Sequence, residues 1–294
     1  YFDHLSHRRN CPMQSIALVA DIHSNILALE AILKAIRRKH KPDRIISLGD
    51  QINLGPAPRE TLDLLKQENA VCLHGNHERY VLSAMRHDPA YAGANFASLE
   101  FNVKQLSEEE ITFPKSLMID GVTFCHAMPD EDRFPIDDYN QALSRLQSMQ
   151  FTPPPHIICG HSHNPAHYAL TTLIIDSIGS SGCMDDGVSG IASYTMLYLS
   201  PGKTVLRPCF VSYDPAPLKE LYIKSGFAEA CPIMAHVTCL QLQNNYDYLS
   251  EFVGKARALQ ALKKETAMSM ETWQETDRYF NWVGGVSTAE FWRK

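Results

Sequence analysis

The feature that most constrains this chain is a regular alternation of short apolar runs with helical patterns. Residues 15–20 (SIALVA) form a brief, continuous and partly β-branched run, which is typical of a strand buried on both faces. A helix follows it, with Ser24 or Asn25 as the cap. The same cycle repeats with strands at 44–50 and 70–76 and helices at 59–67 and from residue 78. This order predicts right-handed strand–helix–strand units in a sheet covered on both faces.

The later part of the core changes character. Two more strands are predicted at 121–126 and 156–161. Three apolar runs, at 171–176, 193–200 and 204–213, then follow without helices between them, as expected for an antiparallel meander. The sequence therefore predicts a mixed α/β core over roughly residues 13–215.

The two ends of the chain differ from this core. Residues 1–12 are basic and irregular, and are either a disordered arm or residues ahead of a natural start at Met13. Beyond Pro217 helical patterns dominate, with apolar faces over 249–262 and 270–283. We expect residues 216–294 to be a mainly helical appendage packed on the core, because apolar stripes more often cover a core than bind a partner.

Polar side chains follow five of the predicted strands, at the point where each strand ends. In an open α/β sheet, ligands bind in the crevice beyond the carboxyl ends of the strands. Glycines at 49, 75 and 160 precede three of these groups, where a tight turn or a close backbone approach is expected. The polar residues are Asp21, His23, Asp50, Asn76, His77, His126, His161 and His163.

This set of residues predicts a metal site. Any one of these histidines alone is more often a hydrogen-bonded core residue, but independent core histidines have no reason to share one end of five strands. Imidazole, carboxylate and carboxamide donors without cysteine suit Mn²⁺, Fe, Zn²⁺ or Ni²⁺ rather than a structural zinc site. His161 and His163 could reach two adjacent ions, and Asp50, alone on its strand end, is the natural bridging ligand.

The same residues resemble the calcineurin-like metallophosphoesterases. That family carries the blocks DxH, GDxxxxG, GNH(E/D), a lone histidine and GHxH, and all five occur here in order over roughly residues 13–215. The resemblance implies an α/β fold, a four-layer α-β-β-α sandwich of two mixed sheets, with a dinuclear centre at its rim. The sequence blocks are DIH from 21, GDQINLG from 49, GNHE from 75, His126 and GHSH from 160.

The resemblance also implies a role for each residue. One metal would be held by Asp21, His23, Asp50 and His163, and the second by Asp50, Asn76, His126 and His161. His77 and Asn76 would face the scissile phosphate. Either Glu78 or Asp50 would orient the His77 ring. Two divalent ions, with Mn²⁺ as the first choice, would activate water for in-line attack on phosphorus. The catalytic residues would then be His77 and Asp50.

Departures from one branch of the family narrow the expected substrate. Ser/Thr protein phosphatases place arginines where this chain has Leu54 and His74, which argues against phosphoprotein substrates. The sequences GDxxxxGPxP and HAxP are more similar to bacterial phosphodiesterase members, some of which hydrolyse diadenosine polyphosphates. Arg133 is a candidate contact for a substrate phosphate, although a solvated arginine is the more frequent role. We expect a phosphodiesterase or phosphatase acting on small molecules or nucleotides.

Two alternatives stay open at this point: a dinucleoside polyphosphate hydrolase and a non-catalytic scaffold of the same fold.

The composition of the chain argues against some broader classes of protein. A net charge of -6 argues against a general nucleic-acid binder, and no apolar run approaches the length of a membrane span. The eight cysteines are scattered without a CxxC pair, which favours reduced core residues and a cytoplasmic protein. The sequence makes no prediction about the oligomer.

Overall fold

The computed structural model describes residues 13–129, 132, 155–169, 173–185, 187–200 and 202–293. The strands are β1 (Gln14–Val19), β2 (Arg44–Ser47), β3 (Val71–Cys72), β4 (Ser116–Ile119), β5 (Val122–Cys125), β6 (His156–Cys159), β7 (Pro165–Ala169), β8 (Ile174–Ile178), β9 (Ile191–Ser200) and β10 (Lys203–Ser212). The core helices are α1 (Ile26–Lys39), α2 (Pro58–Gln67), α3 (Asn76–Met85) and α4 (Ala97–Val103). The C-terminal helices are α6 (Leu218–Lys224), α7 (Phe227–Ala230), α8 (Pro232–Asn244), α9 (Tyr248–Lys263), α10 (Met270–Tyr279) and α11 (Thr288–Phe291).

The described strands form two mixed sheets of five strands each. The first has the order β10-β9-β1-β2-β3, with β1, β2 and β3 parallel, β9 antiparallel to β1 and β10 antiparallel to β9. The second has the order β4-β5-β6-β8-β7, with β5, β6 and β8 parallel. Parallel strands end at the same edge of their sheet. Residues that follow β1 and β2 in the first sheet, and β5 and β6 in the second, can therefore meet at one site between the sheets.

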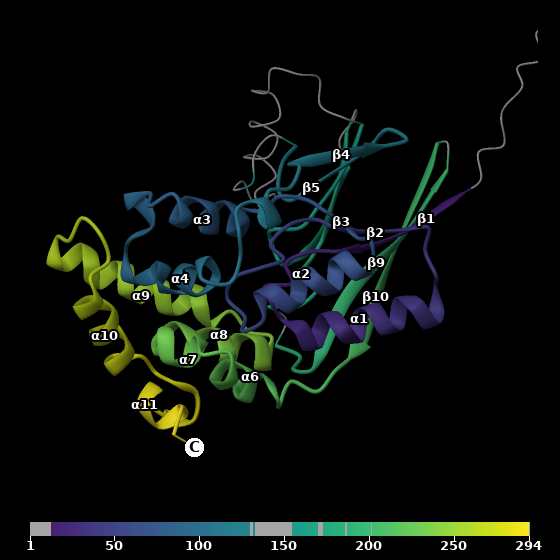
Figure 1. Ribbon diagram of the computed structural model, residues 1–294. Helices are drawn as coiled ribbons and strands as arrows, with labels where there is room; N and C mark the ends of the chain where they lie inside the picture. The colour runs from purple at the N-terminus through teal and green to yellow at the C-terminus, as the bar shows by residue number, and fades with distance from the viewer. Residues whose placement is uncertain are drawn as a thin grey trace, which may run out of the picture.

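Alternation along β1 shows how the sheets pack. Ala17 and Val19 share a buried cluster with the apolar face of α1, including Ile32. Ile16 and Leu18 point the other way and pack with residues of the second sheet, including Phe124 and Ile158. Since successive strand residues face opposite sides, one strand contributes to both cores. The two sheets thus lie face to face with α1 outside the first (Figure 1), which confirms the predicted α/β sandwich.

The expected three-stranded meander is wrong for its first run, whereas the other two runs do pair antiparallel as β9 and β10. The run at 171–176 contributes to β8, which pairs parallel with β6 in the second sheet, whereas β9 and β10 complete the first sheet. Strands β4 and β7 were not predicted, and β3 is only two residues long. Apolar runs show that a segment is buried, but sheet membership depends on long-range pairing that no local pattern records.

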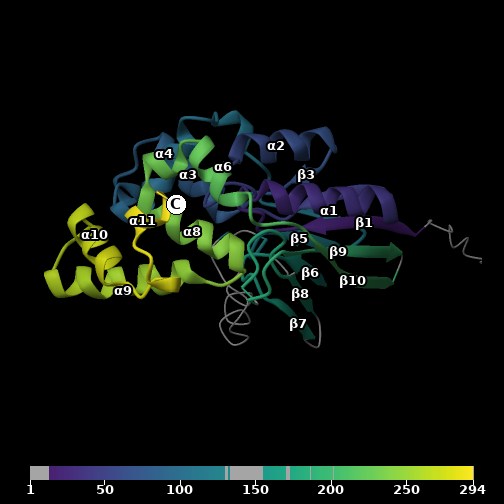
Figure 2. The ribbon, with the colours of Figure 1, turned by 90° about the horizontal axis from the view of Figure 1, so that it is seen from below.

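The C-terminal helices pack on the core near the ends of the parallel strands. Helices α7 and α8 contact α4, and the ring of Phe227 stacks on Phe101 of α4 with centroids 4.5 Å apart. Figures 1 and 2 both place these helices at the end of the molecule toward which β1 runs. Three predicted face residues are wrong, because Leu262, Met270 and Val283 are 80%, 52% and 51% exposed. The boundary at 215/216 stays a prediction, and so does the assignment of residues 1–12, which lie outside the described residues.

Within the described chain, no helix combines the length and apolar character that a membrane crossing requires.

Candidate metal centre

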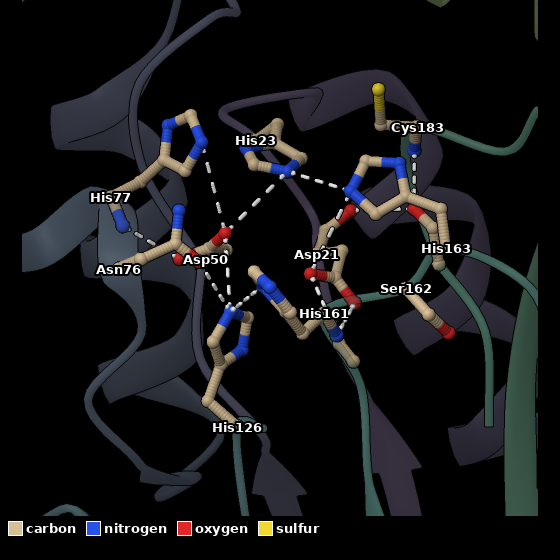
Figure 3. Close-up of polar contacts among 12 residues, drawn as sticks. Asp21, His23, Asp50, Asn76, His77, His126, His161, Ser162, His163 and Cys183 are labelled. Atoms are coloured by element: carbon tan, nitrogen blue, oxygen red, sulfur yellow. Dashed lines mark hydrogen bonds and ion pairs between the residues drawn. The ribbon is translucent and has the colours of Figure 1, made fainter. Parts of the chain in front are cut away.

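The predicted strand-end residues converge at one edge of the sandwich (Figure 3). Both sheets contribute: Asp21 and His23 follow β1, Asp50 follows β2, Asn76 and His77 open α3, His126 follows β5, and His161 and His163 follow β6. The loops that carry them are bonded to one another. The backbone N–H groups of Asp21 and His23 donate to the carbonyls of Gly49 and Asp50, at 3.1 and 3.0 Å.

Several of these loops hold a backbone conformation that side chains disfavour. Asp21, His23, Asp50, His161 and His163 all have positive φ, between 51° and 69°. A left-handed residue other than glycine costs roughly 1–2 kcal/mol, and such strain is concentrated at functional sites. Five of them around one point therefore favour a site maintained for a purpose other than stability.

Two of the predicted glycines allow the loops to approach closely. A Cβ atom on Gly75 would lie 2.2 Å from Asp50 Oδ1, and one on Gly160 would lie 2.6 Å from Asp21 Oδ2. Any other residue at either position would displace a carboxylate of the site, which confirms the expected close backbone approach.

The first ligand set surrounds Asp21, His23 and His163. The Nε2 atoms of His23 and His163 are 3.2 Å apart, and Nε2 of His163 is 3.7 Å from Asp21 Oδ1. Asp50 Oδ2 lies 3.9 Å from Nε2 of His23. Ligand atoms of Asp21, His23 and His163 all lie within 4.8 Å of one another, close enough to share one ion.

The second ligand set surrounds Asp50, His126 and His161, whose ligand atoms also lie within 4.8 Å of one another. Asp50 Oδ2 is 3.3 Å from Nε2 of His126, and Nδ1 of His161 is 3.1 Å from the same nitrogen. The Asp50 carboxylate therefore borders both sets, as a bridging ligand would.

The contacts of the Asn76 side chain bear on whether the second ligand set fits a cation. Its Oδ1 lies 2.9 Å from His126 Nε2, 2.8 Å from His161 Nδ1 and 3.2 Å from Asp50 Oδ2. His126 uses Nδ1 to donate to the Leu48 carbonyl at 2.9 Å, so Nε2 of the neutral ring carries a lone pair. Rotating the amide would let its NH₂ group donate to these atoms, whereas with a cation bound the carboxamide oxygen would face the ion. Four electron-pair donors converging on one point fit a metal ion.

Burial and charge also fit a cationic occupant. Asp21 and Asp50 are 0% and 2% exposed, and among the described residues their ion pairs are with imidazoles. Burial raises the pKa of Asp21 to about 6. Burial also acts to raise the pKa of Asp50, but His126 and His77 outweigh it and hold that pKa well below 3.8. Buried carboxylates of this kind are stabilised by paired charges or by metals.

The histidines respond differently to the same surroundings. Burial keeps the pKa of His23 well below 6.5, so its ring is neutral and able to ligate. Burial lowers the pKa of His126 as well, but the Asp50 carboxylate overcomes it and raises that pKa to about 9. A proton or a metal ion can satisfy this strong local demand for positive charge at His126.

His77 lies beside the two ligand sets. Its backbone N–H donates to Asp50 Oδ1 at 2.8 Å, and its ring Nε2 is 3.9 Å from Asp50 Oδ2. Asn53 Nδ2 donates to the ring Nδ1 at 2.9 Å, which leaves the proton on Nε2 when the ring is neutral. Asn102 of α4 holds Asn53 in turn, because its Oδ1 accepts the Asn53 backbone N–H at 3.2 Å.

The expected alternative that Glu78 orients His77 is not what the contacts show. The Glu78 carboxylate accepts the backbone N–H groups of Asp50, Gln51 and Gly75, at 2.9–3.0 Å. Glu78 therefore ties the Asp50 loop to the start of α3, and Asn53 makes the orienting contact with the His77 ring. Burial raises the pKa of Glu78 to about 8. Asn53 sits inside the GDQINLG block, which is the one signal that could have pointed to it.

A second missed group lies behind His163. Nδ1 of His163 is 3.2 Å from Asp185 Oδ2, so the carboxylate fixes the ring and leaves Nε2 toward the first set. Cys183, which is fully buried, lies beside the same ring, and His163 has a pKa well above 6.5 because contacts with Asp185 and Cys183 outweigh burial. No sequence pattern marks either residue. Arg133, the predicted phosphate contact, lies outside the described residues.

A cavity of about 430 Å³ opens over these residues. Imidazoles of both ligand sets and of His77 line one side of it. The α8–α9 corner of the C-terminal helices lines the other, through Gln241, Asp247, Leu249 and Ser250.

Parts of this chain are similar in sequence to known proteins. It is 31% identical over 163 residues to an uncharacterized protein of Methanocaldococcus jannaschii, covering 51% of this chain and 63% of that protein. It is 38% identical over 69 residues to serine/threonine-protein phosphatase 2 of Escherichia coli K12, covering 24% of this chain and 32% of that protein. The chain thus spans less than two thirds of either curated relative.

Solved structures match a larger share. A metallophosphoesterase from Sphaerobacter thermophilus superimposes with a TM-score of 0.61 at 21% identity, covering 79% of this chain and 99% of that one. A hypothetical protein from Pyrococcus horikoshii OT3 gives 0.59 at 16% identity, covering 79% and 98%. At these identities the likeness supports the fold.

The family match covers the residues that build the site. The model of the calcineurin-like phosphoesterase family matches residues 15–171, a span that includes every predicted ligand from Asp21 to His163. With more than half of the chain matched and the two-sheet fold in place, this protein belongs to the calcineurin-like phosphoesterase family.

Proposed function

We propose that this protein is a metal-dependent phosphoesterase that hydrolyses small phosphoesters, as a phosphodiesterase or phosphatase. The observation that carries the proposal is the pair of ligand sets that share the Asp50 carboxylate. Asp21, His23 and His163 complete one set, and Asn76, His126 and His161 complete the other. A single structural metal would need one closed set of four ligands, whereas two adjoining sets bordering a cavity suit hydrolysis.

Two divalent ions, when bound, would lower the pKa of water and offset the charge of a phosphoryl group. Other residues of the chain would hold the ligand side chains in position. Asp185 and the Leu48 carbonyl hold the His163 and His126 rings from behind, and the left-handed loops fix the carboxylates. Such outer contacts determine whether ligands are pre-organised for their metal.

His77 would supply a proton donor at the cavity. The hydrogen bond from Asn53 to Nδ1 keeps the proton on Nε2, which faces the cavity edge. Burial lowers the pKa of His77, which favours the neutral ring with this one proton. An Nε2–H group in this place can hydrogen-bond a phosphate oxygen or the oxygen of the leaving group.

The donor types support Mn²⁺ as the activating metal, with Fe, Zn²⁺ and Ni²⁺ as competitors. Imidazole, carboxylate and carboxamide oxygen form a hard-to-borderline set, and ligand type narrows the metal without fixing it. Metal analysis of protein purified without chelator, followed by activity of the apoprotein with each ion, tests this choice directly.

The proposal is tested by hydrolysis of bis-p-nitrophenyl phosphate with added Mn²⁺. We expect Asp50→Asn to reduce kcat by about a thousandfold and to lower the bound metal, because one carboxylate serves both sets. His77→Ala should reduce kcat by about a hundredfold with the metal content unchanged, because His77 is outside both sets.

His167→Ala is the matched control. This histidine is 62% exposed on β7, away from the cavity, so both activity and metal content should match wild type. Equal activity in wild type, Asp50→Asn and His77→Ala would refute the proposed roles. Bound metal without turnover of any phosphoester would favour a scaffold of this fold instead.

A further inference from the structure

The C-terminal helices form one wall of the cavity. The α8–α9 corner contributes Gln241, Asp247, Leu249 and Ser250 to a lining that it shares with imidazoles of the candidate metal centre. Both ribbon views place α8 and α9 at the end of the molecule toward which β1 runs (Figures 1 and 2), and Asp21 and His23 follow that end of the strand. A substrate whose phosphate reached the two ligand sets would therefore extend its remaining group along this wall.

Hydrogen bonds fix the wall to the metal centre. Gln241 is 3% exposed, and its Oε1 accepts the backbone N–H of Leu249, at the start of α9, at 3.1 Å. Its Nε2 donates to Cys183 Sγ at 3.3 Å and lies 3.5 Å from Asp185 Oδ1. Asp185 in turn holds His163. The chain of contacts sets the position of the wall relative to a proposed metal ligand.

The described residues that line the cavity carry charges unlike those of a polyphosphate site. Among the described residues that line it there is no lysine or arginine, and its carboxylates are Asp185 and Asp247. Asp247 caps α9, with its Oδ1 accepting the Ser250 N–H at 2.9 Å. Sites for several phosphates in a row recruit lysine, arginine or extra backbone N–H groups, because each phosphate carries charge that the protein must offset.

We propose that, if the protein is the phosphoesterase described above, this wall selects substrates by charge. The site accepts phosphoesters whose remaining group is neutral or cationic and rejects those that carry a further phosphate, and Asp247 is a charge-selecting residue. Two ions, when bound by the ligand sets, would offset the charge of the reacting phosphate, whereas a second phosphate on this wall would lie beside the Asp247 carboxylate and be repelled by it. The inference separates a small-ester hydrolase from a dinucleoside polyphosphate hydrolase, which the sequence left open.

Two substrates that differ by one phosphate test the proposal. Thymidine 5′-(p-nitrophenyl phosphate) and its 3′-phosphorylated form release the same p-nitrophenolate, so leaving-group chemistry cancels. We expect kcat/KM to be about tenfold lower for the 3′-phosphorylated ester at low salt. The third substrate, p-nitrophenyl phosphorylcholine, carries a trimethylammonium group in place of the nucleoside.

Asp247→Asn removes the charge and keeps the helix cap, because asparagine caps as well as aspartate. The variant should raise kcat/KM for the 3′-phosphorylated ester by about three- to fivefold and lower it for the phosphorylcholine ester. Changes of opposite sign in two substrates cannot come from general damage to the fold. Glu251→Gln is the control, since Glu251 pairs with Lys255 on α9 and does not line the cavity.

The outcomes separate this inference from the proposed function. Turnover of all three esters with no dependence on charge, or equal effects of Asp247→Asn on every substrate, overturns charge selection and leaves the phosphoesterase standing. Faster hydrolysis of the 3′-phosphorylated ester by wild type also overturns it. Absence of turnover with every ester and metal overturns both.

Discussion

The strand-end rim and the C-terminal helices are both buried, but for opposite reasons. At the rim, Asp21 and Asp50 are almost inaccessible and hold left-handed backbone. In the helices, Trp273 and Phe252 are 1% and 0% exposed and pack edge to face with centroids 4.8 Å apart. Apolar burial stabilises a fold, whereas collecting carboxylates in strained loops opposes it. The rim is therefore organised for a ligand, and the helices supply stability and one wall of the cavity.

The largest expected effect separates these two kinds of burial. Trp273→Ala should lower the free energy of unfolding by about 3–5 kcal/mol, because it leaves a cavity in the helical core. His161→Ala at the rim should change it by less than about 1 kcal/mol in metal-free protein, and yet abolish stoichiometric metal binding. Chemical denaturation with chelator present, and metal analysis of folded protein, give the two readouts.

The contrast between the rim and the helices is contradicted if the helix variant loses metal or the rim variant loses stability. A Trp273→Ala protein that still folds but has lost its metal would tie the helical core to ligand geometry. A strongly destabilised His161→Ala apoprotein would show that the rim supports the fold. Trp273→Phe is the milder control and should fall between wild type and alanine in stability.

A smaller effect is expected where the core meets the rim, at Asn53. Asn53→Asp tolerates the same backbone, φ 67°, but cannot donate to Nδ1 of His77. The carboxylate would instead favour a protonated ring, so kcat should fall about tenfold with metal content unchanged.

The pH profile distinguishes this role from general damage. In Asn53→Asp the pH at which activity changes with His77 protonation should move upward, because a nearby carboxylate raises the pKa of the ring. Asn53→Gly, which also accepts positive φ, should lower kcat without that displacement. An unchanged profile in both variants would show that Asn53 does not orient His77.

The smallest effect concerns a histidine that belongs to the helices. His236 is 1% exposed between the rings of Trp282 and Phe291, at 4.0 and 4.1 Å, and burial lowers its pKa to about 3. The unfolded chain binds a proton below its ordinary pKa of about 6.5 and the folded chain does not. The stability that depends on this neutral ring is complete above that pH and declines as the pH falls toward 3, with a slope of up to about 1.4 kcal/mol per pH unit.

His236→Gln removes that proton uptake. Denaturation of wild type and variant at several pH values between 7 and 5 should give a shallower loss of stability in the variant. The slope is the readout, since the substitution itself changes packing. Parallel curves for the two proteins would show that His236 does not titrate differently on folding.

Several features could be predicted from the sequence because they are local. The alternation of buried runs and capped helices gave β1, α1, β2 and α2 to within a few residues, and Gly160 predicted a close approach that its missing Cβ permits. Sheet membership could not be predicted: β8 pairs with β6, and the face of α9 ends before Leu262. Pairing between distant strands depends on which surfaces remain to be covered, and a local pattern does not contain that information.

By itself the sequence determined which chemistry gathers at the strand ends, because each ligand type directly follows a run that must be a buried strand. Only the tertiary structure decided what stands behind and opposite those ligands. Asp185, Gln241 and Asp247 lie outside every motif, and Asn53 occupies a variable position inside one; each acts through a partner that folding brings close. A motif records residues that must touch a ligand, whereas the shape and charge of the space around it come from packing between distant segments.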